Sequence, residues 1–321
     1  KADRVACGAE VARKRAEKSH VVLVNQAFAL ARPEFFRRLV FDECEHLHEQ
    51  AHNAWSRTLP FRELRGILSR IRQSDRPYSR AVLDRLERQV LAGSPSGDQV
   101  ELCAGAHEAL LECVEDLEQA AVDFDLWRRE ELRVRPESEQ HFLMREYAEQ
   151  QGGALIRARI ATSHAGAALE TSLAELAERI ADMPLRGASQ LRRALDISRS
   201  DLDEALQTIG AWLPLEDEKP SFADSYFYDV EPEPRGGLVL AARVLLPNEV
   251  LGRAYYPELA SAAFLSATTW LGGGFDAAKA YLGLDRAERP ADGEDRVGSI
   301  VRTFKAPDVF DWSRVLVAIP K

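Results

Sequence analysis

Two adjacent carboxylates, Asp42 and Glu43, follow a short apolar run at residues 39–41. This run predicts a short buried strand, and ligands bind outside the carboxyl ends of strands in an open α/β sheet. An aspartate there can hold Mg²⁺, usually through water, and the next glutamate can orient or deprotonate a water that attacks a γ-phosphate. The pair therefore indicates hydrolysis of a nucleoside triphosphate, with Asp42 as the metal residue and Glu43 as the water-activating residue.

A structural interpretation of the same pair stays open, because a strand followed by Asp-Glu is common and an acidic pair can simply cap the next helix. A second candidate segment, Ser266, Ala267 and Thr268, follows another apolar run at residues 262–265. Small hydroxyl side chains at that place can form hydrogen bonds to the acidic segment. Ser-Ala-Thr is a weak signal by itself, so the wider sequence has to decide between the two interpretations.

Several segments appear along the chain in the order of known helicase motifs. They are residues 20–30 (HVVLVNQAFAL), 42–45 (DECE), 264–270 (FLSATTW), 281–285 (YLGLD) and 306–312 (APDVFDW), with an apolar run at 314–320. Their order and rough spacing resemble those of the DinG/XPD family of superfamily-two DNA helicases. The resemblance covers both ends of the chain and is weak between about residues 59 and 221.

The resemblance implies a fold and a function. The fold would be α/β, a RecA-like motor half with a parallel sheet, interrupted by a large all-helical insertion similar to the family's arch domain. The function would be ATP-dependent translocation on single-stranded DNA, 5′ to 3′ as in the family, with ATP and Mg²⁺ required. The helical insertion would also offer a surface for protein partners.

The resemblance also implies roles for individual residues. Glu45, Ser266, Ala267 and Thr268 would couple hydrolysis to movement, and Asn25 and Gln26 would lie near the DNA. Cys7 would be the last of four cysteine ligands of a 4Fe–4S cluster, and one thiolate alone cannot hold such a cluster.

Three departures from the family pattern bear on activity. Glu45 and Gln26 stand where the family usually has histidine, and no G-x-x-x-x-G-K-[ST] occurs in the 321 residues. We therefore expect an interior piece of a helicase, with the Walker A region and the second motor domain supplied by other segments. Two other classes remain open: a degenerate, non-catalytic accessory subunit that binds DNA or protein, and a helical scaffold with coincidental motifs.

The hydrophobic pattern divides the chain into three parts. Residues 1–58 and 216–321 carry the motifs and short strand-like runs, and we assign them to the two parts of the motor domain. Residues 59–215 repeat apolar side chains at the three-to-four spacing of helices almost throughout, which predicts the helical insertion. Residues 21–25, rich in β-branched side chains, predict a strand buried on both faces.

The overall charge argues against a nucleic-acid binder, because the formal net charge is −10. Binding depends on local potential, however, and residues 57–88 contain nine arginines against four acidic residues. Arg62 and Arg65 of this segment are candidate DNA-binding residues, since the planar guanidinium suits phosphate. A solvated helix face with internal ion pairs explains the segment equally well.

Compartment and membrane association can also be judged from the sequence. No apolar run approaches the 18 uncharged residues that a membrane span needs. The four scattered cysteines show no disulfide framework, so a reducing cytoplasm is the expected location.

Overall fold

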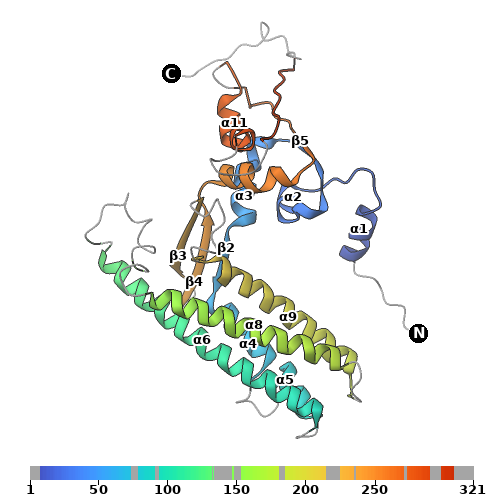
Figure 1. Cartoon of the computed structure of the whole chain (residues 1–321), viewed down its shortest axis with the longest axis vertical. Helices are drawn as coiled ribbons and strands as arrows, with labels where there is room; N and C mark the ends of the chain where they lie inside the picture. The colour runs from blue at the N-terminus through green and yellow to red at the C-terminus, as the bar shows by residue number, and fades with distance from the viewer. Residues whose placement is uncertain are drawn as a thin grey trace. The chain divides into compact units, whose positions relative to one another are not determined.

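The computed structural model describes residues 8–73, 79–90, 94–131, 133, 147, 153–180, 185–214, 225–234, 236–270, 273–289 and 298–306. These residues combine helices and strands, with a small parallel sheet and a large helical region (Figure 1). The chain forms two compact units, one of residues 1–55 and 246–321 and the other of residues 56–245. Cys7 lies outside the described residues.

The first unit contains short elements from both ends of the chain. Its N-terminal elements are α1 (Gly8–Ala16), α2 (Gln26–Ala31), η1 (Pro33–Phe35), β1 (Arg38–Phe41), η2 (Cys44–His46) and α3 (Leu47–Trp55). Its C-terminal elements are α10 (Pro247–Val250), η6 (Leu251–Tyr255), η7 (Tyr256–Glu258), β5 (Ser261–Phe264), α11 (Asp276–Leu282) and α12 (Leu284–Glu288).

Strands β1 and β5 are parallel neighbours, with Arg38 opposite Ser261 and Phe41 opposite Phe264. Both strands were predicted from their apolar runs, and both are present. The predicted burial of residues 39–41 holds only for Phe41, since Val40 is 66% exposed. The rings of Phe41 and Phe264 stack with their centroids 5.4 Å apart. Phe41 is buried, which contributes roughly 1.5–3 kcal/mol to this core. The two ends of the chain are thus joined through one small sheet.

The predicted buried strand at residues 21–25 is wrong for the described structure. The segment has no strand assignment, and Val21 and Leu23 are 81% and 96% exposed. A cavity of about 920 Å³, lined by residues 21–24 and by β1, separates the segment from the edge of the sheet. Without a neighbouring strand in hydrogen-bonding distance, the β-branched side chains have no sheet face to pack against.

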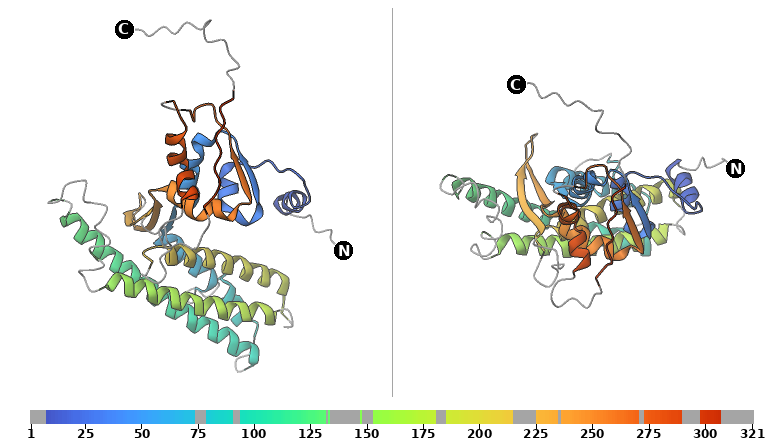
Figure 2. Two further views of the ribbon diagram at one scale, coloured as in Figure 1. Left: turned by 45° about the horizontal axis from the view of Figure 1, so that its top comes forward. Right: turned by 90° about the horizontal axis from the view of Figure 1, so that it is seen from above.

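The second unit is mainly helical. Its helices are α4 (Phe61–Ile71), α5 (Val82–Glu87), α6 (Pro95–Glu131), α8 (Ala154–Ile180) and α9 (Ala188–Ala211). The long helices α6 and α8 lie side by side and α9 packs against α8 (Figure 2). The helical insertion predicted from the spacing of apolar residues is therefore present in this part of the chain.

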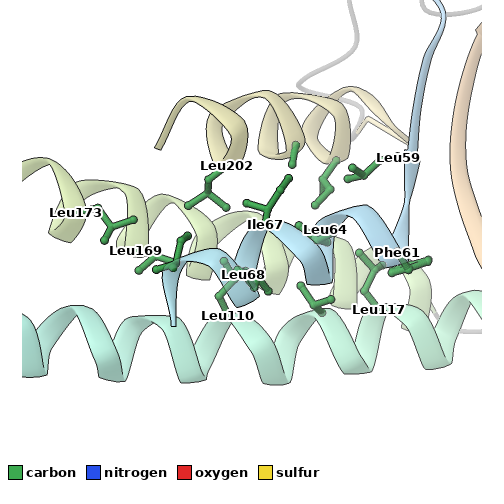
Figure 3. Packing of buried hydrophobic residues seen from close by; sticks show 14 of the residues in the cluster. Leu59, Phe61, Leu64, Ile67, Leu68, Leu110, Leu117, Leu169, Leu173 and Leu202 are labelled. Atoms are coloured by element: carbon green, nitrogen blue, oxygen red, sulfur yellow. The ribbon is translucent and has the colours of Figure 1, made fainter. Parts of the chain in front are cut away.

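Helix α4 explains how this unit forms its core. Leu64, Ile67, Leu68 and Ile71 recur at three-to-four spacing, and all four are buried. Figure 3 shows this face of α4 between α6, which contributes Leu110, and α9. The apolar face of α4 is stable in this position because α6 and α9 together remove it from water.

A three-stranded antiparallel sheet completes the second unit, with the order β2 (Arg57–Pro60), β4 (Leu238–Val244) and β3 (Tyr226–Pro232). Because β2 pairs with β4, residues 226–244 fold with the helices. The units therefore divide after Trp55 and Leu245, whereas the sequence pattern placed the boundaries after residues 58 and 215. No helix in the described residues has the length and apolar character to cross a membrane.

Candidate functional site

The two motif segments meet at one edge of the parallel sheet. Because β1 and β5 run in register, Asp42 and Leu265 both leave the sheet at its carboxyl end. The Leu265 N–H donates to the Phe41 carbonyl over 2.8 Å, and the Cys44 N–H donates to the Leu265 carbonyl over 3.1 Å. These bonds fasten the acidic segment 42–45 to the segment 266–268, which are more than 200 residues apart in sequence.

Glu43 has a rare backbone conformation at the centre of this site. Its φ of 51° and ψ of 47° lie in the left-handed region, which costs a residue with a Cβ about 1–2 kcal/mol. The Asp42 carboxylate accepts a hydrogen bond from the Glu43 N–H over 3.1 Å. Backbone strain of this kind often occurs at functional sites, where the surroundings hold it in place.

Gln26 helps to hold this turn. Its Nε2 donates to the Asp42 carbonyl over 2.7 Å and to the Glu43 carbonyl over 3.3 Å. Asn25 acts as the N-cap of α2, since its Oδ1 accepts from the Phe28 N–H over 2.8 Å. The structure thus gives both residues local roles in shaping the site, while their predicted proximity to DNA stays a prediction.

Glu45 contacts the segment 266–268. A hydrogen bond from the Ser266 hydroxyl lowers the pKa of the Glu45 carboxyl below its ordinary value. The Ser266 hydroxyl also lies 3.1 Å from the Thr268 hydroxyl and accepts from the Thr268 N–H over 3.0 Å. A chain of polar contacts therefore connects Glu45 to Ser266 and Thr268, while Ala267 contributes the small side chain between them.

Cys44 differs from its acidic neighbours. Its side chain is fully buried, and this burial, reinforced by the charge of Glu45, raises the pKa of the thiol to about 11. A protonated, inaccessible thiol is neither a nucleophile nor a metal ligand. Cys44 is therefore a core residue that anchors the turn between β1 and α3.

A cleft of about 810 Å³ opens beside these residues. Asp42, Glu43, Glu45 and Ser266 line it from the carboxyl ends of β1 and β5. Its other walls come from α11, from Phe275 and from residues 300–304 and 306. Asp42 and Glu43 are both exposed, so their carboxylate oxygens, which are ligands of the kind that Mg²⁺ prefers, can reach a molecule in the cleft.

No known protein-family model matches this chain, and no curated protein matches it.

The predicted DNA-binding arginines lie in the other unit and are engaged in ion pairs. Arg62 donates to Glu233 over 2.5 Å, and Arg65 donates to Glu118 through two nitrogens, the shorter contact being 2.5 Å. Their side chains remain 58% and 43% exposed. These contacts give them a structural role in joining elements of the helical unit, and DNA binding by them stays a prediction.

Proposed function

We propose that this chain is part of an ATP-dependent helicase or translocase that acts on single-stranded DNA and resembles the DinG/XPD type. In this proposal the first unit is half of a RecA-like motor and the second is the arch-like insertion. One observation carries the proposal: the acidic segment 42–45 and the segment 266–268 leave adjacent parallel strands at the same edge and are hydrogen-bonded there. An interpretation of the acidic pair as a helix cap does not account for this second segment.

The residues of the site can be assigned steps of hydrolysis. Asp42 would hold Mg²⁺, which when bound neutralises charge on the phosphates. Glu43, on its strained turn, would orient or deprotonate the attacking water. Glu45 would sense the state of this site and pass it to Ser266 and Thr268 through their hydrogen bonds.

Other parts of the proposal depend on the family resemblance. The phosphate-binding loop would come from a segment other than these 321 residues, and the second motor domain likewise. Movement would run 5′ to 3′. Cys7 would ligate a 4Fe–4S cluster together with cysteines from elsewhere.

The experiment is ATP hydrolysis by the full-length protein, with and without single-stranded DNA, beside a Glu43→Gln variant. We expect DNA-stimulated turnover that falls by about 100-fold or more in the variant, because glutamine cannot accept the proton from water. Glu34→Gln is the matched control, since Glu34 is an exposed carboxylate of the same unit that does not line the cleft. Equal turnover in wild type and Glu43→Gln would contradict the assignment.

A degenerate accessory subunit is the second candidate function. The glutamate at 45, the glutamine at 26 and the absence of a G-x-x-x-x-G-K-[ST] sequence favour it. A folded full-length protein that binds DNA without hydrolysing ATP would establish this alternative and exclude the motor.

A further inference from the structure

An aromatic and cationic cluster lies next to the candidate site. Trp270 follows Thr268 by two residues, and its indole meets the ring of Phe275 edge to face, with centroids 4.9 Å apart. The Lys305 ammonium lies 4.9 Å from the centre of the Trp270 ring. Trp270 is nevertheless 41% exposed. An indole that meets one ring edge to face and still exposes 41% of its surface can offer that surface to a flat ligand.

The segment at residues 298–306 places cationic side chains along this surface. Arg302 and Lys305 are both exposed, and because they are three residues apart their Cα atoms lie within about 11 Å of each other. Phe304 between them is 82% exposed. Arg302 and Phe304 line the same cleft as Asp42 and Glu43. Asp42 and Glu43 therefore lie on one wall of this cleft, and Arg302 and Phe304 lie on another.

We infer that Trp270, Lys305 and Arg302 form a contact for single-stranded nucleic acid, in which a base stacks on the indole and the two cations hold phosphates. This inference rests on the proposed function and names the residues by which the first unit holds its strand. Stacking on an exposed aromatic ring requires an unpaired base, and it tolerates any sequence. Two cations three residues apart suit successive phosphates of a strand better than a single phosphate group.

The lysine has a second use in this arrangement. In the free protein its ammonium rests on the indole, which is a favourable cation–π position. When a base takes that position, the flexible lysine stem lets the ammonium move to the neighbouring phosphate. Trp270 and Lys305 can therefore contact each other in the free protein and contact a base and a phosphate when the strand is bound.

The test is fluorescence anisotropy of a labelled oligo(dT) strand with the full-length protein, in the absence of ATP. We expect Trp270→Ala to weaken binding by about 5- to 150-fold, the range for loss of one stacked base, and Trp270→Phe to restore part of it. Lys305→Gln should reduce the slope of log affinity against log salt by about 0.7, because one phosphate contact is lost. Lys305 is exposed, so this second variant does not depend on the folding of Trp270→Ala.

Tyr281→Ala is the matched control. Tyr281 is an aromatic residue of the same unit with 46% exposure, and it stacks on His48 instead of on a cation. Wild-type affinity in Trp270→Ala, equal losses in Trp270→Ala and Tyr281→Ala, or an unchanged salt slope in Lys305→Gln would overturn the inference. Weaker binding of a fluorescent ATP analogue by Trp270→Ala with unchanged oligo(dT) binding would also overturn it, since the indole would then serve the nucleotide.

The proposed function and this inference fail in different measurements. The proposed function fails if the wild-type protein does not hydrolyse ATP, and the inference fails in binding ratios measured without ATP. If Trp270→Ala binds oligo(dT) more weakly and the wild-type protein does not hydrolyse ATP, the inferred DNA contact is supported and the motor function is excluded.

Discussion

Replacing Glu43 by glycine should stabilise the first unit relative to alanine at the same position, even though both variants lose the carboxylate. The reason is the backbone of Glu43, whose φ of 51° is favourable for glycine and unfavourable for any residue with a Cβ. Because both changes remove the same charge and the same side-chain contacts, the comparison isolates the backbone strain.

The expected difference follows from two opposing contributions. Alanine keeps the strain of about 1–2 kcal/mol, which glycine relieves. Glycine gives the unfolded chain extra freedom, which costs about 0.5–1 kcal/mol. The two ranges give a net difference of about 0–1.5 kcal/mol in favour of glycine, and their midpoints give about 0.75 kcal/mol, or about a 3.5-fold smaller equilibrium constant for opening.

Amide hydrogen exchange measures this difference in opening free energy locally, within the first unit of the chain. The Cys44 and Leu265 amides donate across the two motif segments, so their exchange reports opening of the sheet edge next to Glu43. We expect exchange of these amides to be about 3.5-fold slower in Glu43→Gly than in Glu43→Ala. Glu45→Gly and Glu45→Ala provide the control, because Glu45 lies in the 3₁₀ turn η2 and glycine should there be the less stable of the two.

Faster exchange in Glu43→Gly than in Glu43→Ala would refute the reasoning, since the turn would then carry no strain that glycine can relieve. The same order in the pair at position 45 would mean that glycine acts through general flexibility instead.

Two further predictions concern titration. Ser266→Ala should raise the pKa of the Glu45 carboxyl toward its ordinary value, since the Ser266 hydroxyl is the main cause of the lowered value. The stability from that hydrogen bond is fully present above the ordinary glutamate pKa and is lost as the pH falls through the lower pKa of the folded state. Carboxylate NMR titration of wild type and Ser266→Ala measures the pKa of Glu45 in each. An unchanged pKa in the variant would exclude the contact. Burial lowers the pKa of His107, whose Nε2 lies 3.0 Å from the Leu68 carbonyl. Its neutral form stabilises the helical unit fully above the ordinary histidine pKa and loses this effect as the pH falls toward the folded value. The urea midpoint should therefore fall more between pH about 7.5 and 5.5 in wild type than in His107→Gln; parallel curves would contradict the assignment.

The strands and helices that carry the site could largely be predicted from local sequence. The apolar runs at residues 39–41 and 262–265 gave strands at the expected places, and the spacing of apolar residues from Leu64 to Ile71 gave helix α4. For α4 the pattern that favours the helix also buries it, so local preference and tertiary packing agree. In the two strands only Phe41 is buried, and Val40 is 66% exposed.

The contacts that depend on distant residues could not be predicted. Gln26 holds the backbone of Asp42 and Glu43, and only the folded chain brings these residues together. The ion pair between Arg62 and Glu233 spans 171 residues of sequence. The arginine-rich segment therefore suggested DNA binding, although several of its arginines have acidic partners within the protein, namely Arg62, Arg65, Arg70 and Arg72.

The strand predicted at residues 21–25 is wrong for the same reason, because its formation depends on distant residues. Its β-branched residues favour extended backbone, but strand pairing requires a neighbouring edge, which sequence pattern does not specify. In the described structure a cavity separates the segment from β1.

We propose that the site formed by residues 42–45 and 266–268 drives movement along single-stranded DNA. Strand displacement by the full-length protein tests it most directly, with one duplex carrying a 5′ single-stranded tail and another carrying a 3′ tail. We predict ATP-dependent displacement from the 5′-tailed duplex that is lost in Glu43→Gln and kept in Glu34→Gln. Failure of the folded, DNA-bound protein to displace either strand in the presence of ATP and Mg²⁺ would contradict the account.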